Sequence, residues 1–276
     1  MALEKMNAYY NDNPDIKSVV DGTNPDCNTC IFAFEGLGAG EGEVISVHPQ
    51  GFLNAMMVVT KGKEIVYVTR NASTLPDNRP APNKHVVILP KIYTYKVGNH
   101  NVGDSERKYI ALIPNTYDWY GWYAKEETDP NTNAKIFLGF EEKYCDGINL
   151  HATHDHKLSD SSGFSEGCQT VYYEDYVAFG KAVGFLDKNM TYTTDVSIND
   201  VGLGKYMHAL VKTTSEHDSD TFPNEIKYIL DRSYDEQNKY YYNMLSTFGK
   251  DSEEYINYAT TYKDYLNGIF YPISEE

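Results

Sequence analysis

Residues 55–70, AMMVVTKGKEIVYVTR, hold two apolar runs on either side of Lys61-Gly62-Lys63. Two such runs around a short turn with a glycine are typical of a β-hairpin. Further short apolar runs follow, and turn-forming stretches such as PDNRPAPNK and DPNTN separate them. The expected strands are HVVILPKIYTYKVG (85–98), KYIALIP (108–114), AKIFLGF (134–140) and GINLHA (147–152). This density of short strands predicts a mainly β domain over residues 31–152.

The chain changes character after residue 168. Residues 172–186 place apolar side chains at helical spacing, and a short helix is expected within 204–213. NEIKYILDR (224–232) reads as a last strand, and residues 235–271 read as two helices. The predicted fold is therefore mainly β, a sandwich or barrel with added helices that include a C-terminal helical hairpin.

Composition excludes several classes of protein. The chain has 276 residues, of which 41% are hydrophobic, and a formal charge of −16. That charge argues against nucleic-acid binding, which needs a basic face, and against docking on anionic lipid. No apolar run reaches the roughly 18 residues of a membrane helix, so no membrane insertion is expected. The start, MALEKMNAYYNDNPD, lacks the apolar core of a secretory signal.

The stretch HATHDHKLSDSSGFSEGC, residues 151–168, admits two kinds of chemistry. His151, His154 and His156 could serve as zinc ligands, since zinc sites use two or three histidines. Their H-x-x-H-x-H spacing matches no established zinc motif, however, so neither a metal nor another cofactor is expected. The other interpretation is a thiol site at Cys168.

A thiol site needs a base and an oxyanion-binding turn. A turn of small residues at Gly167 lets backbone N–H groups converge on one point during acyl transfer. A cysteine also needs a base or an imidazolium partner to become a thiolate at neutral pH. His151 follows the apolar GINL, and the loop 153–165 would return Cys168 to the same edge of the sheet.

A family resemblance supports the thiol interpretation. The order H-A-T, polar loop, S-E-G-C resembles the signature of the L,D-transpeptidase (YkuD-like) catalytic domain, which runs His-Gly-Thr, a loop, then Ser-His-Gly-Cys. NASTLPDNRP followed by LPKIYTYKVGNH is similar to the hairpin that precedes the site in that family, and KYILDR looks like its closing strand. The resemblance covers roughly residues 50–232, and its specific motif lies within 149–168.

The resemblance implies a role for each residue of the motif. Cys168 would be the nucleophile that forms a thioester with a donor peptide, and His151 would accept the thiol proton. The main chain at Ala152 would orient the imidazole. The N–H groups of Gly167 and Cys168 would line the oxyanion hole, and Ser165 would shape the turn.

The chain also departs from the family pattern. Glu166 stands where the family has its second histidine, and Gln169 and Thr170 replace an apolar residue and an Arg or Asn. Lys91 stands at the position of a turn glycine. Ser165, Glu166 and Gln169 remain candidate substrate contacts. Transpeptidation and hydrolysis both stay open, because either an amine or water can attack the thioester.

The resemblance implies cysteine-dependent acyl transfer on peptidoglycan stem peptides, and hence action on the cell wall outside the cytoplasm. The expected domains are an N-terminal extension (1–30, irregular or a short helix), a catalytic domain (31–232) and a helical extension (233–276). Without a recognisable signal the export route stays open, and a phage lysis enzyme or a delivered wall-targeting toxin would fit. Two alternatives remain: a zinc-dependent peptidoglycan amidase that uses His151, His154 and His156, and a non-catalytic wall-binding protein.

Four further groups of residues have two possible roles each or a structural role. His100, in GNHN, is expected in a turn, where it either faces the cleft or is an ordinary loop histidine. Trp119 and Trp122 lie in the aromatic run DWYGWYA and form either a substrate wall or a packed hairpin face. Cys145 is expected to be structural. Cys27 and Cys30 read as a local disulfide or two inert thiols, with a metal or redox role as the alternative.

Overall fold

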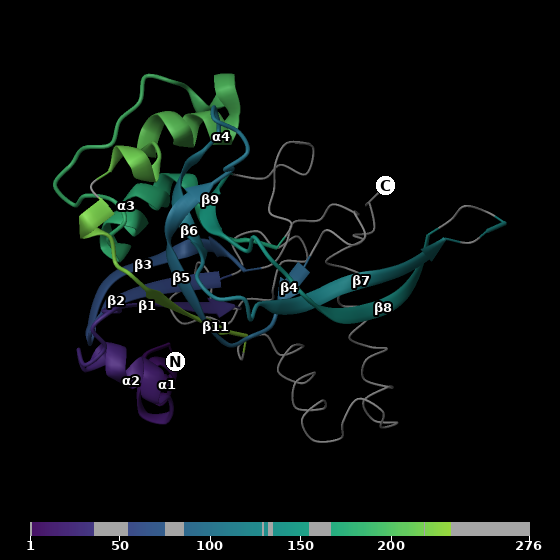
Figure 1. Ribbon diagram of the computed structural model, residues 1–276, viewed down its shortest axis with the longest axis horizontal. Coiled ribbons are helices and arrows are strands. Elements are labelled where there is room, and N and C mark those ends of the chain that lie inside the picture. Colours follow the sequence, from purple (N-terminus) through teal and green to yellow (C-terminus); the bar gives the residue numbers. More distant parts are fainter. Residues whose placement is uncertain are drawn as a thin grey trace.

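The computed structural model describes residues 2–35, 55–74, 86–128, 130–131, 135–154, 167–217 and 219–232. Eight strands form a closed barrel in the order β1-β11-β5-β6-β9-β10-β3-β2 (Figure 1). In that order their bounds are Thr29–Glu35, Ile226–Asp231, Ile92–His100, Tyr109–Pro114, Leu150–Thr153, Gln169–Tyr172, Glu64–Ser73 and Ala55–Lys61. The pairs β1–β11 and β9–β10 are parallel, and the other pairs are antiparallel. The expectation of a mainly β fold with added helices is confirmed.

The predicted hairpin at 55–70 is present. β2 and β3 pair antiparallel from Lys61 and Glu64 at the turn to Ala55 and Ala72 at the far end. The strands expected at 108–114 and 224–232 appear as β6 and β11. β11 closes the barrel, because it pairs with both β1 and β5.

The single strand expected over 85–98 is wrong. The chain forms β4 (Val86–Ile88) and then β5, and the two strands belong to different sheets. The break falls at Leu89–Lys91, where Pro90 cannot donate a ladder hydrogen bond. β4 instead joins β7 (Tyr120–Thr128) and β8 (Lys135–Tyr144) in a three-stranded sheet that extends from one side of the barrel (Figure 1).

Two helices precede the first strand, so of the two expectations for residues 1–30, irregular or a short helix, the helical one is confirmed. They are α1 (Ala2–Asp12) and α2 (Pro14–Val20), and the side chain of Asn13 accepts hydrogen bonds at the start of α2. Buried Ile16, Val19 and Val20 follow helical spacing and pack with Phe32 on the outside of β1. The N-terminal segment is therefore part of the packed structure (Figure 1).

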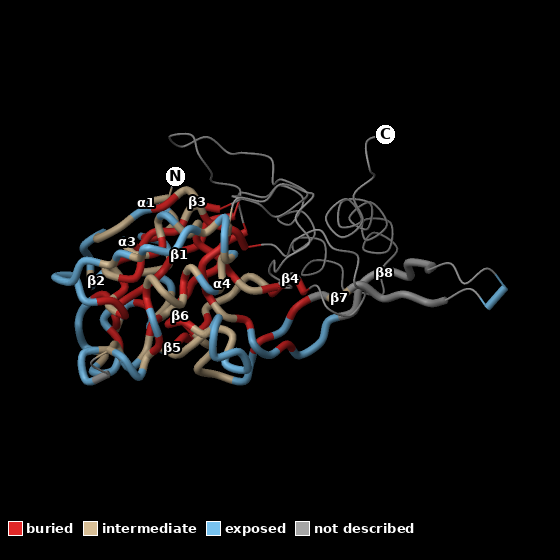
Figure 2. Tube along the Cα trace, turned by 90° about the horizontal axis from the view of Figure 1, so that it is seen from above, coloured by how far each residue is buried: buried red, intermediate tan, exposed pale blue. Residues whose placement is uncertain are grey.

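The remaining helices cover the strands that carry the candidate site. α3 (Tyr173–Val183) confirms the helix expected at 172–186 and packs on β3 and β10. α4 (Ile198–Val211) packs on β6, is longer than the helix expected at 204–213, and is kinked at Gly202. Two short 3-10 turns, η1 (Thr214–Glu216) and η2 (Ser219–Thr221), lead to β11. The buried residues fill the barrel and the layer beneath these helices (Figure 2).

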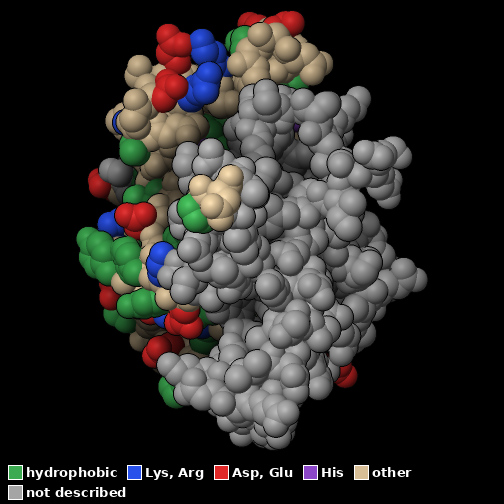
Figure 3. Space-filling view, turned by 90° about the vertical axis from the view of Figure 1, so that its right-hand side faces the viewer, with side chains coloured by type: hydrophobic (Ala, Val, Ile, Leu, Met, Phe, Trp, Pro, Cys, Tyr) green, Lys and Arg blue, Asp and Glu red, His purple; other side chains and the backbone are tan. Residues whose placement is uncertain are grey.

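The predicted C-terminal helical hairpin lies outside the described residues. On the described part of the face in Figure 3, acidic side chains are interspersed with basic ones. None of the helices within the described ranges is both long and apolar enough to cross a membrane.

Candidate active site

Parallel pairing of β9 and β10 brings His151 and Cys168 to adjacent strands. Thr170 is the register partner of His151, and the N–H of Gln169 donates to the carbonyl of Asn149 at 2.9 Å. Cys168 directly precedes β10, two residues before Thr170, so strand alternation places it on the same side as His151. Strand rise and spacing put the two Cα atoms about 8 Å apart.

The thiol of Cys168 is half-buried. Its Sγ donates a hydrogen bond to the carbonyl of Gly147 at 3.3 Å. In this conformation the thiol is thus directed at the segment that leads into β9 rather than at the imidazole of His151.

The imidazole of His151 is held by the main chain next to it. Its Nδ1 lies 2.7 Å from the carbonyl oxygen of Ala152, and its side chain is buried, with 5% exposed. A carbonyl can only accept, so Nδ1 carries the proton and Nε2 keeps a lone pair. Burial lowers the pKa of His151 to about 4, although the Ala152 hydrogen bond opposes this shift. The ring is therefore neutral at pH 7 and able to accept a proton.

His100 is the last residue of β5, not part of a turn as expected. Its ring stacks on that of His151, with the centroids 3.9 Å apart and the planes at 11°. Its Nδ1 lies 3.1 Å from the side-chain nitrogen of Asn149. Burial and the neighbouring His151 hold the pKa of His100 far below its usual value. Of the two expectations for His100, the structure supports proximity to the site.

Gly167 is a position that only glycine fits. Its φ is +153°, and an added Cβ would lie 2.2 Å from Cγ1 and 2.8 Å from the carbonyl oxygen of Val86. Val86 belongs to β4, so the second sheet packs directly against the turn before Cys168. This contact explains why the turn contains a residue without a side chain.

The side chain of Gln169, a predicted substrate contact, makes its hydrogen bonds inside the protein. It is fully buried, and its Oε1 accepts a hydrogen bond from the hydroxyl of Tyr228 at 2.6 Å. Its Nε2 donates to the carbonyl of Gly167 at 3.2 Å. Gln169 therefore braces the turn before Cys168 from inside the barrel.

Trp119 does not form a substrate wall either. Only 1% of it is exposed, and its ring stacks on Tyr93 with the centroids 4.0 Å apart. It packs the core, as the alternative of a packed hairpin face implied. The side chain of Trp122 lies outside the described atoms, as do the predicted contacts Ser165 and Glu166.

The other three cysteines are buried, reduced thiols. A local disulfide between Cys27 and Cys30 is therefore wrong. Burial raises the pKa of Cys27, and it raises those of Cys30 and Cys145 to about 12. These three thiols are therefore buried and weakly acidic, as expected for inert or structural cysteines. Cys168 is the most accessible of the four.

The zinc alternative gains no support from the described residues. Within them, no group of three or more His, Cys, Asp or Glu side chains could hold a metal ion. His154 stacks on Tyr173 at the start of α3, whereas His151 stacks on His100. His156 lies outside the described ranges.

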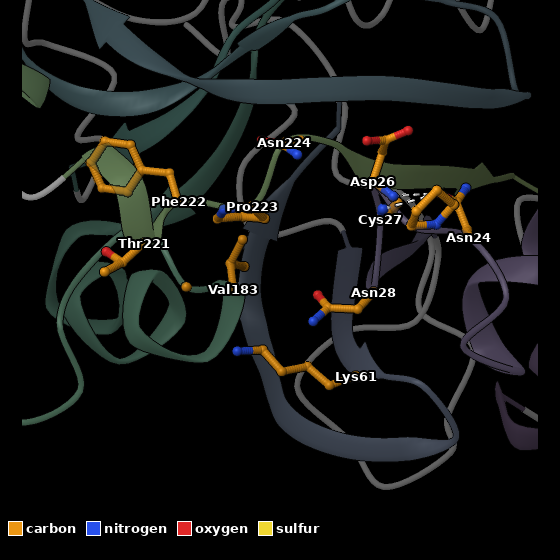
Figure 4. Close-up of a pocket in the computed structure, with 12 residues that line it drawn as sticks. Asn24, Asp26, Cys27, Asn28, Lys61, Val183, Thr221, Phe222, Pro223 and Asn224 are labelled. Atoms are coloured by element: carbon orange, nitrogen blue, oxygen red, sulfur yellow. Dashed lines mark hydrogen bonds between the residues drawn. The ribbon is translucent and has the colours of Figure 1, made fainter.

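Two cavities are lined by different parts of the molecule. A pocket of about 280 Å³ lies near the turn, where Lys61 reaches toward Val183 and Pro223 (Figure 4). The opposite end of β3 pairs with β10, through Ser73 and Thr170, so this pocket is remote from Cys168. A second cavity, of about 410 Å³, has His100 and His151 in its wall.

Comparison with known proteins identifies no relative of this chain. No protein-family model matches the chain. No curated protein and no solved structure is significantly similar to it.

Proposed function

We propose that the protein is a cysteine-dependent acyltransferase or hydrolase of L,D-transpeptidase type that acts on peptidoglycan stem peptides through Cys168. The observation that carries the proposal is the fixed tautomer of His151. Its Nδ1 donates to the Ala152 carbonyl, which leaves Nε2 with a free lone pair on the strand beside the cysteine. The proposal includes the assignment of the barrel to an L,D-transpeptidase-like fold and action on the cell wall.

The chemistry follows from the residues in place. A change of side-chain rotamer would turn the Cys168 thiol from Gly147 to the imidazole. His151 Nε2 takes the thiol proton, the thiolate attacks the peptide carbonyl, and a C–S bond forms as the C–N bond breaks. The imidazolium returns its proton to the leaving amine. An amine or water then attacks the thioester, and the thiol is regenerated.

A carbapenem tests this reading directly. Its strained amide carbonyl acylates an activated thiol and adds the whole drug to the protein mass. We expect an adduct on the wild-type chain that Cys168→Ala lacks and that Cys145→Ala keeps, as measured by intact-mass spectrometry. A wild-type chain without an adduct, or an adduct retained by Cys168→Ala, contradicts the proposal.

A further inference from the structure

A third cavity adjoins the pocket near the turn of the β2–β3 hairpin. It has a volume of about 510 Å³, and its walls come from the end of β2, from the end of α3 with the loop after it, and from the segment of η1 and η2. It shares Lys61, Gly184, Thr221 and Phe222 with the pocket shown in Figure 4. None of its lining residues belongs to the candidate active site.

Three lysines, Lys61, Lys181 and Lys188, bring positive charge to this cavity. Lys181 is engaged, because its Nζ donates to the carbonyl of Met190 at 2.7 Å and lies 5.5 Å from the centre of the Tyr192 ring. Lys61 and Lys188 form neither a hydrogen bond nor an ion pair within the described part of the chain. The cavity therefore has two unpaired ammonium groups in its walls.

The two carboxylates in the same walls have partners of their own. The Oδ1 of Asp187 accepts the N–H of Asn189 at 2.8 Å, which fixes the turn after α3. The Oε1 of Glu216 accepts the hydroxyl of Thr213 at 3.2 Å, and its Oε2 lies 3.6 Å from the Nζ of Lys212, which is not a lining residue. Neither carboxylate compensates the two unpaired ammonium groups.

Lys61 lies over the end of α3. Its side chain extends from β2 toward Val183 (Figure 4), and a Cβ added to Gly184 would lie 3.5 Å from its Nζ. The carbonyl end of a helix attracts a cation, yet none of the carbonyls of α3, a helix that is described throughout, accepts a hydrogen bond from this nitrogen. Desolvation by the surrounding walls lowers the pKa of Lys61, and the charge of Lys188 adds to this effect. An anion between the two ammonium groups would offset their repulsion.

Aromatic rings form another part of the wall. His217 packs against both Tyr192 and Phe222, with ring centroids 6.3 and 6.4 Å away. Its Nε2 donates to the carbonyl of Val211 at 2.7 Å, and this bond fixes the ring in place. His217 and Phe222 both line the cavity, so an apolar surface lies beside the lysines.

We infer that this cavity binds a small organic phosphate, whose phosphate group lies between the ammonium groups of Lys61 and Lys188 and whose organic part packs on Phe222. A phosphate monoester carries close to two negative charges at neutral pH, which match the two unpaired ammonium groups. Lysine binds phosphate as a point charge. The volume of about 510 Å³ is in the range of small-molecule sites. The formal charge of −16 opposes approach to an anionic membrane, which favours a free phosphate ester over a lipid headgroup.

Two anions of similar shape separate charge from size. Phenyl phosphate and phenyl sulfate carry the same ring and a tetrahedral head group, but at neutral pH the phosphate is a dianion and the sulfate a monoanion. In calorimetric titrations of the full-length chain, we expect phenyl phosphate to bind at least about tenfold more tightly than phenyl sulfate. Inorganic phosphate, which lacks the ring, should bind more weakly than phenyl phosphate.

Variants of the two exposed lysines test the assignment of the site. Lys61→Gln and Lys188→Gln should each weaken the binding of phenyl phosphate at least about fivefold, and both chains should fold, because both side chains lie at the surface. Lys96→Gln is the matched control. It removes an exposed cation of β5 that lines neither of the two adjoining cavities, so the affinity should stay unchanged.

Equal affinities for phenyl phosphate and phenyl sulfate, no binding of phenyl phosphate, or full affinity in the Lys61→Gln and Lys188→Gln chains would overturn the inference. Sedimentation with vesicles that contain phosphatidic acid distinguishes a lipid phosphate from a free one. We expect the chain to stay in the supernatant. Binding to these vesicles without binding of phenyl phosphate would reject a small-molecule site.

Discussion

The imidazole rings of His100 and His151 lie face to face, with centroids 3.9 Å apart. Two neutral rings can stack in this way, whereas two imidazolium ions would repel each other at this distance. Burial lowers both pKa values, and His151 adds to the effect on His100. The stacked pair is therefore a structural unit that depends on both rings remaining uncharged.

This dependence makes stability sensitive to acid. The pKa of His151 is about 4 in the folded protein, compared with about 6.5 in an unfolded chain. Between these values the unfolded state binds more protons, so stability falls as the pH falls from about 6.5 toward 4. From pH 7 to pH 5 we expect His151 alone to cost about 2 kcal/mol of unfolding free energy, measured by urea denaturation. A His151→Asn chain with the full wild-type pH dependence would contradict this assignment.

The sequence predicted the neighbouring positions of His151 and Cys168 better than the packing around them. The apolar run before His151 and the small-residue turn before Cys168 were local signals, and β9 and β10 do lie side by side. Gln169 is different, because its position next to a candidate nucleophile suggested a substrate contact. Its partner, Tyr228, is 59 residues away in the chain. Only the closed barrel brings the two together.

Local sequence patterns also failed to predict the packing of the aromatic run 118–124 and the break before β5. Trp119 is buried, whereas Tyr120 is 42% exposed. The sequence of this aromatic run does not tell which of the two neighbouring side chains faces the core. Pro90 is a local signal for the end of a strand, but it lies within a stretch that is otherwise apolar on both sides. His100 could be related to His151 only through the order β5-β6-β9, which no local pattern contains.

Thiol accessibility predicts a strong preference in alkylation. Cys168 is half-buried, whereas the other three cysteines are at most 2% exposed and have raised pKa values. At neutral pH we expect iodoacetamide to modify Cys168 at least roughly tenfold faster than any other cysteine. Peptide mapping over a time course measures the four rates. Faster labelling of Cys27, Cys30 or Cys145 would show that the burial described for these residues is wrong.

Gly167 should tolerate no side chain. In Gly167→Ala the new Cβ meets Val86 at 2.2 Å in a backbone conformation that favours glycine. We expect a loss of about 2–4 kcal/mol in unfolding free energy, together with slower alkylation of Cys168. Gly103→Ala is the matched control, because nothing lies within 4 Å of its added Cβ, and it should stay within about 0.5 kcal/mol. Equal stability of the two variants would contradict the close packing of β4 on the turn.

The buried ion pair of Glu35 and Arg232 supports the same turn from the other side. Arg232 also donates to the carbonyls of Thr74 and Ile88, at 3.3 and 3.0 Å. Gln169 donates to that Thr74 carbonyl at 3.5 Å, so the ion pair is linked to the turn before Cys168. Glu35→Leu would leave a buried guanidinium without its carboxylate, and we expect it to cost about 3–5 kcal/mol in unfolding free energy.

The double variant Glu35→Leu/Arg232→Met separates the free energy of the ion pair from the packing of the two side chains. The double variant removes both members of the ion pair, so its loss should be smaller than that of Glu35→Leu alone. Urea denaturation of the wild type, the two single variants and the double variant gives the coupling free energy. Strictly additive losses would mean that the two side chains stabilise the barrel independently and would contradict the expected coupling.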